Sequence, residues 1–319
     1  MGGWRGSPVA WALATLAIAV AALTLAVGGP GRLVAELAQV DPYRLAASAG
    51  LLVAAEALKG LRLCLLAGRR ARLGACVTAR LLGKAASAIS PAGAAGVPTR
   101  GAVLAGASGI EIGRALGAAL GETLADNIVA LGVILGGAIL GHASIPVVLV
   151  ALLVAALWVG GSAAATSARL AAAVYRRLRV PEDVRCGIER ERELALRALA
   201  ALLTRRAAPP TLLATAAAHL LEAASVMVFW GRWGSPEAWL LSLLAVEASY
   251  IMVSIPTPGG SGAVEYALTA YLGPTLALYW RLTYLLASLS PLALAYTVLP
   301  SLRRYLESYT LTGNCSREA

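Results

Sequence analysis

The sequence predicts an all-α fold, a polytopic bundle of transmembrane helices. Hydrophobic residues fill 59% of the 319 positions and charged residues only 14%, and the mean hydropathy is +0.73, more than a soluble domain of this length carries. Apolar runs of about 20 residues, enough to cross a hydrocarbon core of roughly 30 Å, recur along the chain. These observations exclude a soluble globular protein.

Seven long apolar runs are expected to be helices that cross the membrane. They are residues 8–27, 45–67, 115–140, 145–161, 211–230, 238–255 and 275–299. The first run could also be a signal peptide, but it is longer than the usual apolar region of one, so we expect it to be retained. Segments 81–106 and 256–273 are apolar but broken by Gly and Pro, and each is expected to be re-entrant or an interrupted crossing.

The arginines that give the net charge of +10 are concentrated in short loops beside the apolar runs. Residues 68–80 hold four arginines and no acid, and residues 168–208 hold ten arginines and five acids. Such bias marks the cytoplasmic face, and anionic lipids attract basic segments, so we expect a cell-membrane protein with these loops and both termini in the cytosol. An even number of crossings is then needed, and 256–273 is expected to supply the eighth. Nucleic acid is not an expected partner.

The chain divides into two halves of similar order. Residues 1–167 form the first, 168–208 a cytoplasmic connector, 209–302 the second, and 303–319 a tail. In each half two long runs precede the broken segment and a long run comes directly after it, which is typical of an internal repeat, although chance similarity is the alternative. Apolar residues of the connector share one helical face, so its helix either lies along the membrane surface or is a solvated link.

The broken segments are the candidate binding site. Two prolines and three glycines interrupt the second one: Pro256, Pro258, Gly259, Gly260 and Gly262. Proline ends a helix and glycine permits tight turns, so a new helix near Ser261 would aim free N–H groups into a cavity. Paired breaks of this kind indicate a mid-membrane site in transporters, whereas a tight turn outside the membrane is the alternative.

Ionisable residues within the apolar runs are the second indication of a site. A charge at mid-bilayer costs about 2.5–3.5 kcal/mol and is expected to face a cavity or a partner. The candidate members of an intramembrane charge network are Glu122, Asp126, His219, Glu222 and Glu247. His219 and Glu222 have the spacing of a hydrogen-bonded pair on one helical face. Lys59 and Arg62 are expected to extend to the cytoplasmic boundary.

Glycines recur at every fourth position beside Glu122 and Asp126, namely Gly109, Gly113, Gly117 and Gly121. This spacing lets helices approach closely, and we expect it to serve packing within the chain rather than a dimer, whose existence the sequence leaves open.

No metal, cofactor or complete catalytic site is expected. Two histidines cannot form a metal cluster, and four cysteines without CxxC spacing predict neither a metal site nor a disulfide framework. Glu122 and Asp126 could act as acid and base, but nothing completes an active site. Without a GxxxxGK[ST] run, driven transport would depend on an ion gradient.

Several motifs resemble the lysylphosphatidylglycerol synthase transmembrane-domain family, also described as flippase-like. "SIPTPGGSGAVEYALTAYLG" followed by "LYWRLTYLLASLSPLAL" is similar to its C-terminal signature, and "SPAGAAGVPTRGAVL" and "LGETLADNIVAL" to its first-half patterns, with Ala95, Val97 and Thr123 departing from them. The resemblance implies about eight crossings and the movement of lipids between leaflets. The resemblance does not extend to the family's soluble aminoacyl-transferase domain, so we do not expect aminoacyl-transferase activity.

The sequence therefore predicts a membrane protein that binds, and moves between leaflets, an anionic or polyprenyl-linked lipid. Arg100, Arg281 and the amides after Pro258 would contact the headgroup phosphate, while Glu122 and Glu265 would orient the arginines or carry a coupling proton. The alternative is a non-catalytic accessory or scaffold subunit of a membrane glycosyltransferase or lipid-modifying complex.

Overall fold

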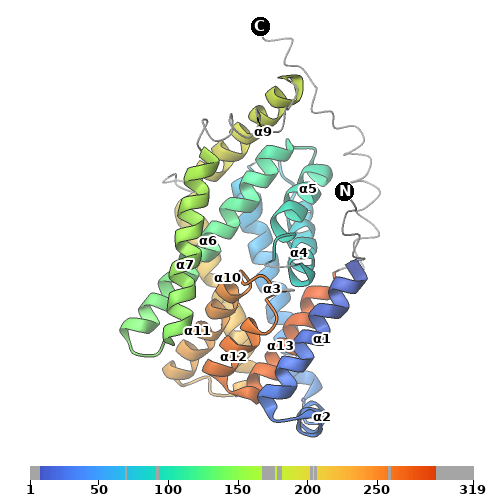
Figure 1. Cartoon of the computed structure of the whole chain (residues 1–319), viewed down its shortest axis with the longest axis vertical. Helices are drawn as coiled ribbons and strands as arrows, with labels where there is room; N and C mark the ends of the chain where they lie inside the picture. Colours follow the sequence, from blue (N-terminus) through green and yellow to red (C-terminus); the bar gives the residue numbers. More distant parts are fainter. Residues whose placement is uncertain are drawn as a thin grey trace.

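The computed structural model describes residues 8–68, 70–90, 93–166, 177, 182–201, 204, 207–257 and 260–291. Within these ranges the protein has twelve α-helices and no strand (Figure 1). The helices are α1 (Pro8–Val27), α2 (Pro30–Ala38), α3 (Pro42–Ala67), α4 (Leu73–Ile89), α5 (Gly96–Ser108), α6 (Ile112–Ile139), α7 (Ile145–Thr166), α9 (Glu182–Ala201), α10 (Ala208–Trp230), α11 (Pro236–Met252), α12 (Ala263–Leu272) and α13 (Pro274–Leu289). The all-α prediction is confirmed.

The helices begin and end at proline, glycine and capping residues of the sequence. Prolines occupy the first turn of α3, α11 and α13, where their missing N–H would have no helical partner. The Asp41 carboxylate caps α3 by accepting from the Tyr43 N–H at 2.9 Å, and the Ser235 hydroxyl caps α11 through Ala238. Gly231 ends α10 in the left-handed conformation, with φ +71°. All seven predicted runs overlap helices, although residues 292–299 lie outside the described part.

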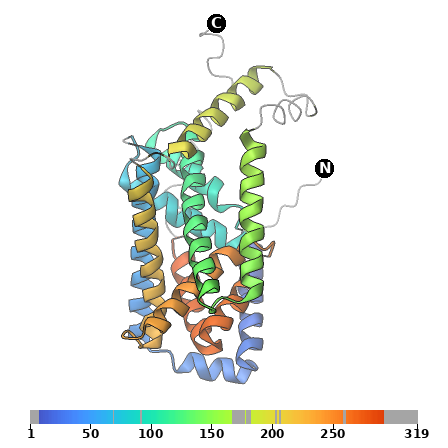
Figure 2. The same ribbon diagram turned by 90° about the vertical axis from the view of Figure 1, so that its left-hand side faces the viewer.

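The helices form an elongated bundle in which α6 has a central position. It contacts α3, α5, α7, α9, α10 and α11. Helices α3 and α10 lie side by side along one flank, and α2 crosses the lower end (Figure 2). One apolar core joins α3 to α4, α5 and α6, and a second joins α6 and α7 to the helices from α10 onward.

Four consecutive helices in each half pack in the same order. In the first half α3, α4, α5 and α6 each contact the next helix, and in the second half α10, α11, α12 and α13 do the same. The breaks fall at equivalent places, since residues 90–95 separate α4 from α5 and residues 253–262 separate α11 from α12. The sequence predicted two long runs before each break, 8–27 and 45–67 in the first half. In the structure the helices that correspond to α10 and α11 are α3 and α4, so the repeated unit begins at α3 and not at α1.

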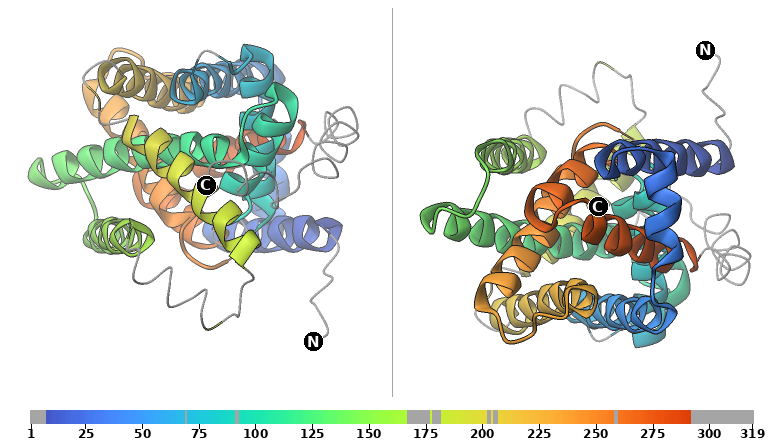
Figure 3. Two further views of the ribbon diagram at one scale, coloured as in Figure 1. Left: turned by 90° about the horizontal axis from the view of Figure 1, so that it is seen from above. Right: turned by 90° about the horizontal axis from the view of Figure 1, so that it is seen from below.

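The glycine row of α6 packs against the connector helix α9. A Cβ on Gly113 or Gly117 would lie 2.1 or 2.2 Å from a carbonyl oxygen of α9, that of Glu191 or Ala195. Gly109 precedes α6 and takes no part, because nothing lies within 4 Å of its Cβ position. The row therefore serves packing within the chain, as predicted. Helix α9 runs obliquely over one end of the bundle (Figure 3, left), so it is more than a solvated link.

Length and composition identify fewer spans than the eight predicted. Helices α6 and α10 are long and apolar enough to cross a membrane, and a third span results if α1 and α2, bent by 94° at their junction, count as one. Helix α3 has 26 residues but carries Glu56, Lys59 and Arg62 in its second half. Helices α11 and α13 have 17 and 16 residues. The protein is a helical membrane protein, and the described residues do not confirm the predicted number of eight crossings.

A disulfide joins Cys64 at the end of α3 to Cys76 near the start of α4, with Cα atoms 5.7 Å apart. The prediction of no disulfide was wrong. The reason is that the short basic loop between the two helices folds back on itself, with the Ala71 N–H bonded to the Gly68 carbonyl, and so brings distant positions within bonding range.

Candidate functional site

Six helices bring eleven ionisable side chains into one buried cluster, which we call the charge network. Its members are Glu56, Lys59 and Arg62 on α3, Arg80 and Lys84 on α4, Arg100 on α5, Glu122 and Asp126 on α6, His219 and Glu222 on α10, and Glu247 on α11. None is more than 8% exposed. Buried charges of this density require close partners, and the contacts below supply them.

Glu122 is shared by three arginines from three helices. Its carboxylate lies 2.7 Å from Arg100 Nη1, 3.0 Å from Arg62 Nη2 and 3.3 Å from Arg80 Nη1. Arg62 also makes a two-pronged contact with Asp126, at 2.6 and 3.1 Å. Ion pairs to the single carboxylate of Glu122 thus link α3, α4 and α5 to α6.

Lys59 and Arg62 do not extend to a membrane boundary, so that prediction was wrong. Both are fully buried. Lys59 Nζ donates to Glu222 at 2.8 Å and to the Tyr250 hydroxyl, which itself donates to Glu222 at 2.6 Å. Carboxylates on α6 and α10 lie within reach at the same depth, and a buried pair with direct hydrogen bonds takes the place of solvation at an interface.

Glu56 neutralises the cations of α4. It accepts hydrogen bonds at 2.7 Å from Arg80 Nε and from Lys84 Nζ. Lys84 also lies over the ring of Tyr284, with its Nζ 4.4 Å from the centroid. Helix α4 is therefore joined to both α3 and α13 through charged contacts.

His219 pairs with two other helices rather than with Glu222. Its Nδ1 lies 2.5 Å from Glu247 Oε1 and its Nε2 lies 3.1 Å from Asp126 Oδ1. The ring stacks on Tyr250 with 5.1 Å between centroids. The predicted pair of His219 with Glu222 was wrong because each residue finds a closer partner across the bundle.

The second break is held by a separate ion pair. Glu265 on α12 accepts a hydrogen bond at 2.7 Å from Arg281 Nε on α13. Its other oxygen accepts at 2.5 Å from the N–H of Gly262, where φ is +91°. The break also approaches the end of α11 closely, because a Cβ on Gly260 would lie 2.6 Å from the Cα of Val253.

This geometry changes what the second break can offer a ligand. The Gly260 N–H is bonded to the Thr257 carbonyl and the Gly262 N–H to Glu265, so neither amide is free to contact a headgroup. That part of the prediction was wrong, since the tight turn uses its own donors. Pro256 is exposed. Pro258 and Gly259 lie outside the described residues.

A cavity of about 370 Å³ borders the charge network. Its wall includes three network cations and one carboxylate: Arg80, Lys84, Arg100 and Asp126. Glu56 and Glu122, which neutralise those cations, are not part of the wall. Arg100 also bonds the Thr123 hydroxyl at 2.7 Å on the same wall. The wall of the cavity thus carries three cations and one carboxylate, and the closest carboxylate partners of the cations, Glu56 and Glu122, are not part of it.

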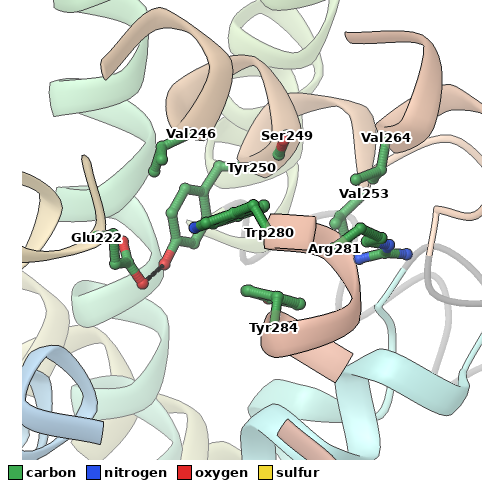
Figure 4. A pocket seen from close by; sticks show the side chains of 9 residues that line it. All are labelled: Glu222, Val246, Ser249, Tyr250, Val253, Val264, Trp280, Arg281 and Tyr284. Carbon is green, nitrogen blue, oxygen red and sulfur yellow. Dashed lines mark hydrogen bonds between the residues drawn. The ribbon is translucent and has the colours of Figure 1, made fainter. Parts of the chain in front are cut away.

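A smaller space of about 20 Å³, the size of one water molecule, adjoins this cavity. Tyr250, Val253 and Tyr284 line both. Figure 4 shows Glu222 bonded to Tyr250 at one side of it and Arg281 at the other, with Trp280 between them. Arg281 Nη2 is buried and has no hydrogen-bond partner. The second-half arginine therefore has a donor left for a ligand or water.

The sequence predicted site roles for Glu122, Asp126, Arg100 and Arg281. It predicted none for Arg80 or for the cavity tyrosines, Tyr250 and Tyr284. The sequence places Arg80 in a basic loop. The four-residue spacing of Arg80 and Lys84, which places both on one helical face, was the available signal. Tyr284 lies within the "RLTY" element, so the resemblance could have indicated it.

A family model described as the lysylphosphatidylglycerol synthase TM region matches residues 11–301. The matched range contains both breaks, the whole charge network and the cavity. No match was found among curated proteins or solved structures.

Proposed function

The chain belongs to the lysylphosphatidylglycerol synthase transmembrane family, and on this premise we propose that it binds an anionic or polyprenyl-linked lipid and moves it between leaflets. Family membership makes it a membrane protein with a lipid-related role. The observation that carries the finer proposal is the cationic wall of the 370 Å³ cavity. In this proposal the chain crosses the membrane about eight times, with the second break as one crossing.

The chemistry of the wall favours a phosphate ligand. Arg80, Lys84 and Arg100 are buried, and each has a close carboxylate partner, Glu56 or Glu122, that does not line the cavity. Guanidinium groups bind phosphate oxygens through paired N–H donors, and an ammonium group adds a compact charge. The cavity volume suits a headgroup, so the acyl or polyprenyl chains would remain in the lipid.

Arg281 is the second candidate for the headgroup. Glu265 fixes its Nε, while its Nη2 is unpartnered beside Tyr284, which also lines the larger cavity. Once the 20 Å³ space beside Arg281 widens, a phosphate passing Tyr284 would leave Arg100 in the first half and reach Arg281 in the second. Two stations of this kind on either side of a shared aromatic residue support movement rather than static binding.

The test uses purified protein in vesicles with fluorescent phosphatidylglycerol, and a membrane-impermeant quencher that reports lipid arriving in the outer leaflet. We expect faster movement of phosphatidylglycerol than of zwitterionic phosphatidylcholine, and a loss of about tenfold or more in the Arg100→Gln variant. Arg232→Gln, in the exposed turn after α10, is the matched control. Equal rates for both lipids in the unaltered protein would refute selective transport.

The accessory-subunit alternative is distinguished by the same preparation. Retained anionic lipid without any movement in vesicles would favour a binding or scaffold role over transport.

A further inference from the structure

His219 lies at the middle of a membrane-spanning helix, between carboxylates from two other helices. It is the twelfth of the 23 residues of α10, and its side chain is 1% exposed. Asp126 on α6 faces one ring nitrogen at 3.1 Å, and Glu247 on α11 faces the other at 2.5 Å. We call these three residues the triad.

Proton counting shows that the triad can take up one exchangeable proton. A neutral imidazole has one N–H, so only its doubly protonated form can donate to both carboxylates. If the ring were neutral and both acids ionised, a nitrogen lone pair would face a carboxylate oxygen inside the protein. The geometry is satisfied when one additional proton resides on His219 or on one of the acids.

Every helix packed on α10 contributes to the surroundings of His219. Helix α3 brings Lys59 and Arg62, α6 brings Asp126, α11 brings Glu247 and Tyr250, and Glu222 stands on α10 itself. Helix α13 meets α10 through Trp280, whose indole donates to Ser225 at 2.7 Å. Lys59 and Arg62 each have a carboxylate partner, Glu222 and Asp126.

The remaining charges of the network cancel. Five lysines and arginines (Lys59, Arg62, Arg80, Lys84, Arg100) face five carboxylates (Glu56, Glu122, Asp126, Glu222, Glu247). The proton on the triad therefore gives the network a net charge of +1, equal and opposite to that of one phosphodiester. An uncompensated charge in a low-dielectric interior is costly, so the proton and an anion stabilise each other there.

We propose that the triad takes up a proton when the cavity takes up a monoanionic phosphodiester headgroup. The link is Asp126, which faces His219 and also lines the cavity. The proton comes from solution and returns to it, and no bond to the lipid is made or broken. Because coupling between two ligands is reciprocal, protonation strengthens headgroup binding as much as the headgroup strengthens protonation. This inference rests on the proposed function and adds its energy source.

Coupled binding would give transport a direction. Loading is favoured on the more acidic side of the membrane and release on the less acidic side. A proton gradient would then drive the lipid without nucleotide hydrolysis.

The first test measures binding of dihexanoylphosphatidylglycerol to the purified protein by calorimetry in buffers of different ionisation enthalpy. We expect uptake of about one proton per lipid, and an affinity that falls by up to about tenfold per pH unit once the free triad loses its proton. Binding that is independent of pH and without proton uptake overturns the inference but leaves the proposed function standing. Absence of binding overturns both. Dihexanoylphosphatidylcholine is the control lipid.

The second test locates the proton without altering the triad. The chain has two histidines, and His142 lies exposed in the turn after α6, so the His142→Gln variant leaves His219 as the sole histidine signal. Nitrogen-15 NMR of this variant should show both ring nitrogens protonated with dihexanoylphosphatidylglycerol bound, at a pH where the lipid-free protein shows one. An unchanged ring state at every pH, with and without bound lipid, rules out His219 as the group that takes up the proton.

A substitution of the triad completes the design. His219→Gln should bind the same lipid more weakly and without pH dependence, whereas His142→Gln should keep the full pH dependence. A pH dependence that survives in His219→Gln would place the proton elsewhere and refute the assignment.

Discussion

Glu122 on α6 accepts a hydrogen bond from Arg100 on α5 at 2.7 Å, directly after the first break. The corresponding helices of the second half are joined by Glu265 on α12 and Arg281 on α13, at the same distance. Acid and base have exchanged helices between the halves. Each pair fixes the short helix that follows a break to the next helix.

Glu122→Gln should destabilise the protein more than any change to a surface acid. Three arginines would lose a shared counter-charge, and breaking a buried ion pair costs about 3–5 kcal/mol. The matched control is Glu193→Gln on α9, whose pair with Arg197 is more than half exposed and should contribute less than about 1 kcal/mol. Thermal unfolding in detergent measures both, and similar melting temperatures would contradict the central position of Glu122.

Arg281→Lys should express near the normal level but lose most co-purified lipid. Lysine keeps the charge but cannot donate to Glu265 and to a phosphate through a planar fork. Glu265→Gln should weaken lipid retention less, because an amide oxygen can still accept from the Gly262 N–H. Mass spectrometry of lipids bound to equal amounts of folded protein decides the matter. Unchanged lipid in both Arg281→Lys and Arg281→Ala would exclude a headgroup role.

Gly117→Ala should separate α9 from α6. The new Cβ would lie 2.2 Å from the Ala195 carbonyl oxygen and 2.7 Å from its Cα, and backbone atoms cannot move aside as a flexible side chain can. We expect a loss of about 1–3 kcal/mol and faster proteolysis of the connector. Gly132→Ala on the same helix is the control, since nothing lies within 4 Å and alanine favours helix by up to about 1 kcal/mol. Equal proteolysis rates would show that the close contact has no role in holding α9.

Cys64 and Cys76 should be unreactive to maleimide until the protein is reduced, because their sulfurs are joined. Peptide mass spectrometry of the alkylated protein, with and without reductant, reads each cysteine separately. Full labelling of both before reduction would show two free thiols at this helix junction.

The sequence was sufficient for the long helices, but it did not predict α2 or the first turns of α4, and it did not identify the side-chain partners. Helix α1 begins and ends at the predicted residues, because Pro8 and the glycines after Val27 bound an uninterrupted apolar run. A charge such as Lys59 indicates only that a partner is required. Its partner, Glu222, lies 163 residues away, and the choice depends on how α3 packs on α10. Local periodicity contains no information about a contact of that range.

The same limit explains the errors at His219 and at the second break. Spacing on one helix suggested Glu222, but the carboxylates that face His219 come from α6 and α11. The free amides expected after Pro258 depended on an open turn, whereas Glu265 folds back onto the Gly262 N–H. In contrast, the pairing of Arg100 with Glu122 agreed with expectation because each sits on a helix beside the same break.

The long-range pairs of α3 also constrain how the protein is made. The partners of Glu56, Arg80 and Lys84, follow it within 28 residues. The partner of Arg62, Asp126, follows 64 residues later, and the partner of Lys59, Glu222, follows 163 residues later. At about 5–20 residues per second, the ribosome needs about 8 to 30 seconds to reach Glu222. During that interval α3 carries an unpaired ammonium group at a depth where lipid is a poor solvent for it. We therefore expect α3 to remain in a hydrated or protein-lined environment during insertion until α10 has emerged, so that the second half of the chain assists the assembly of the first.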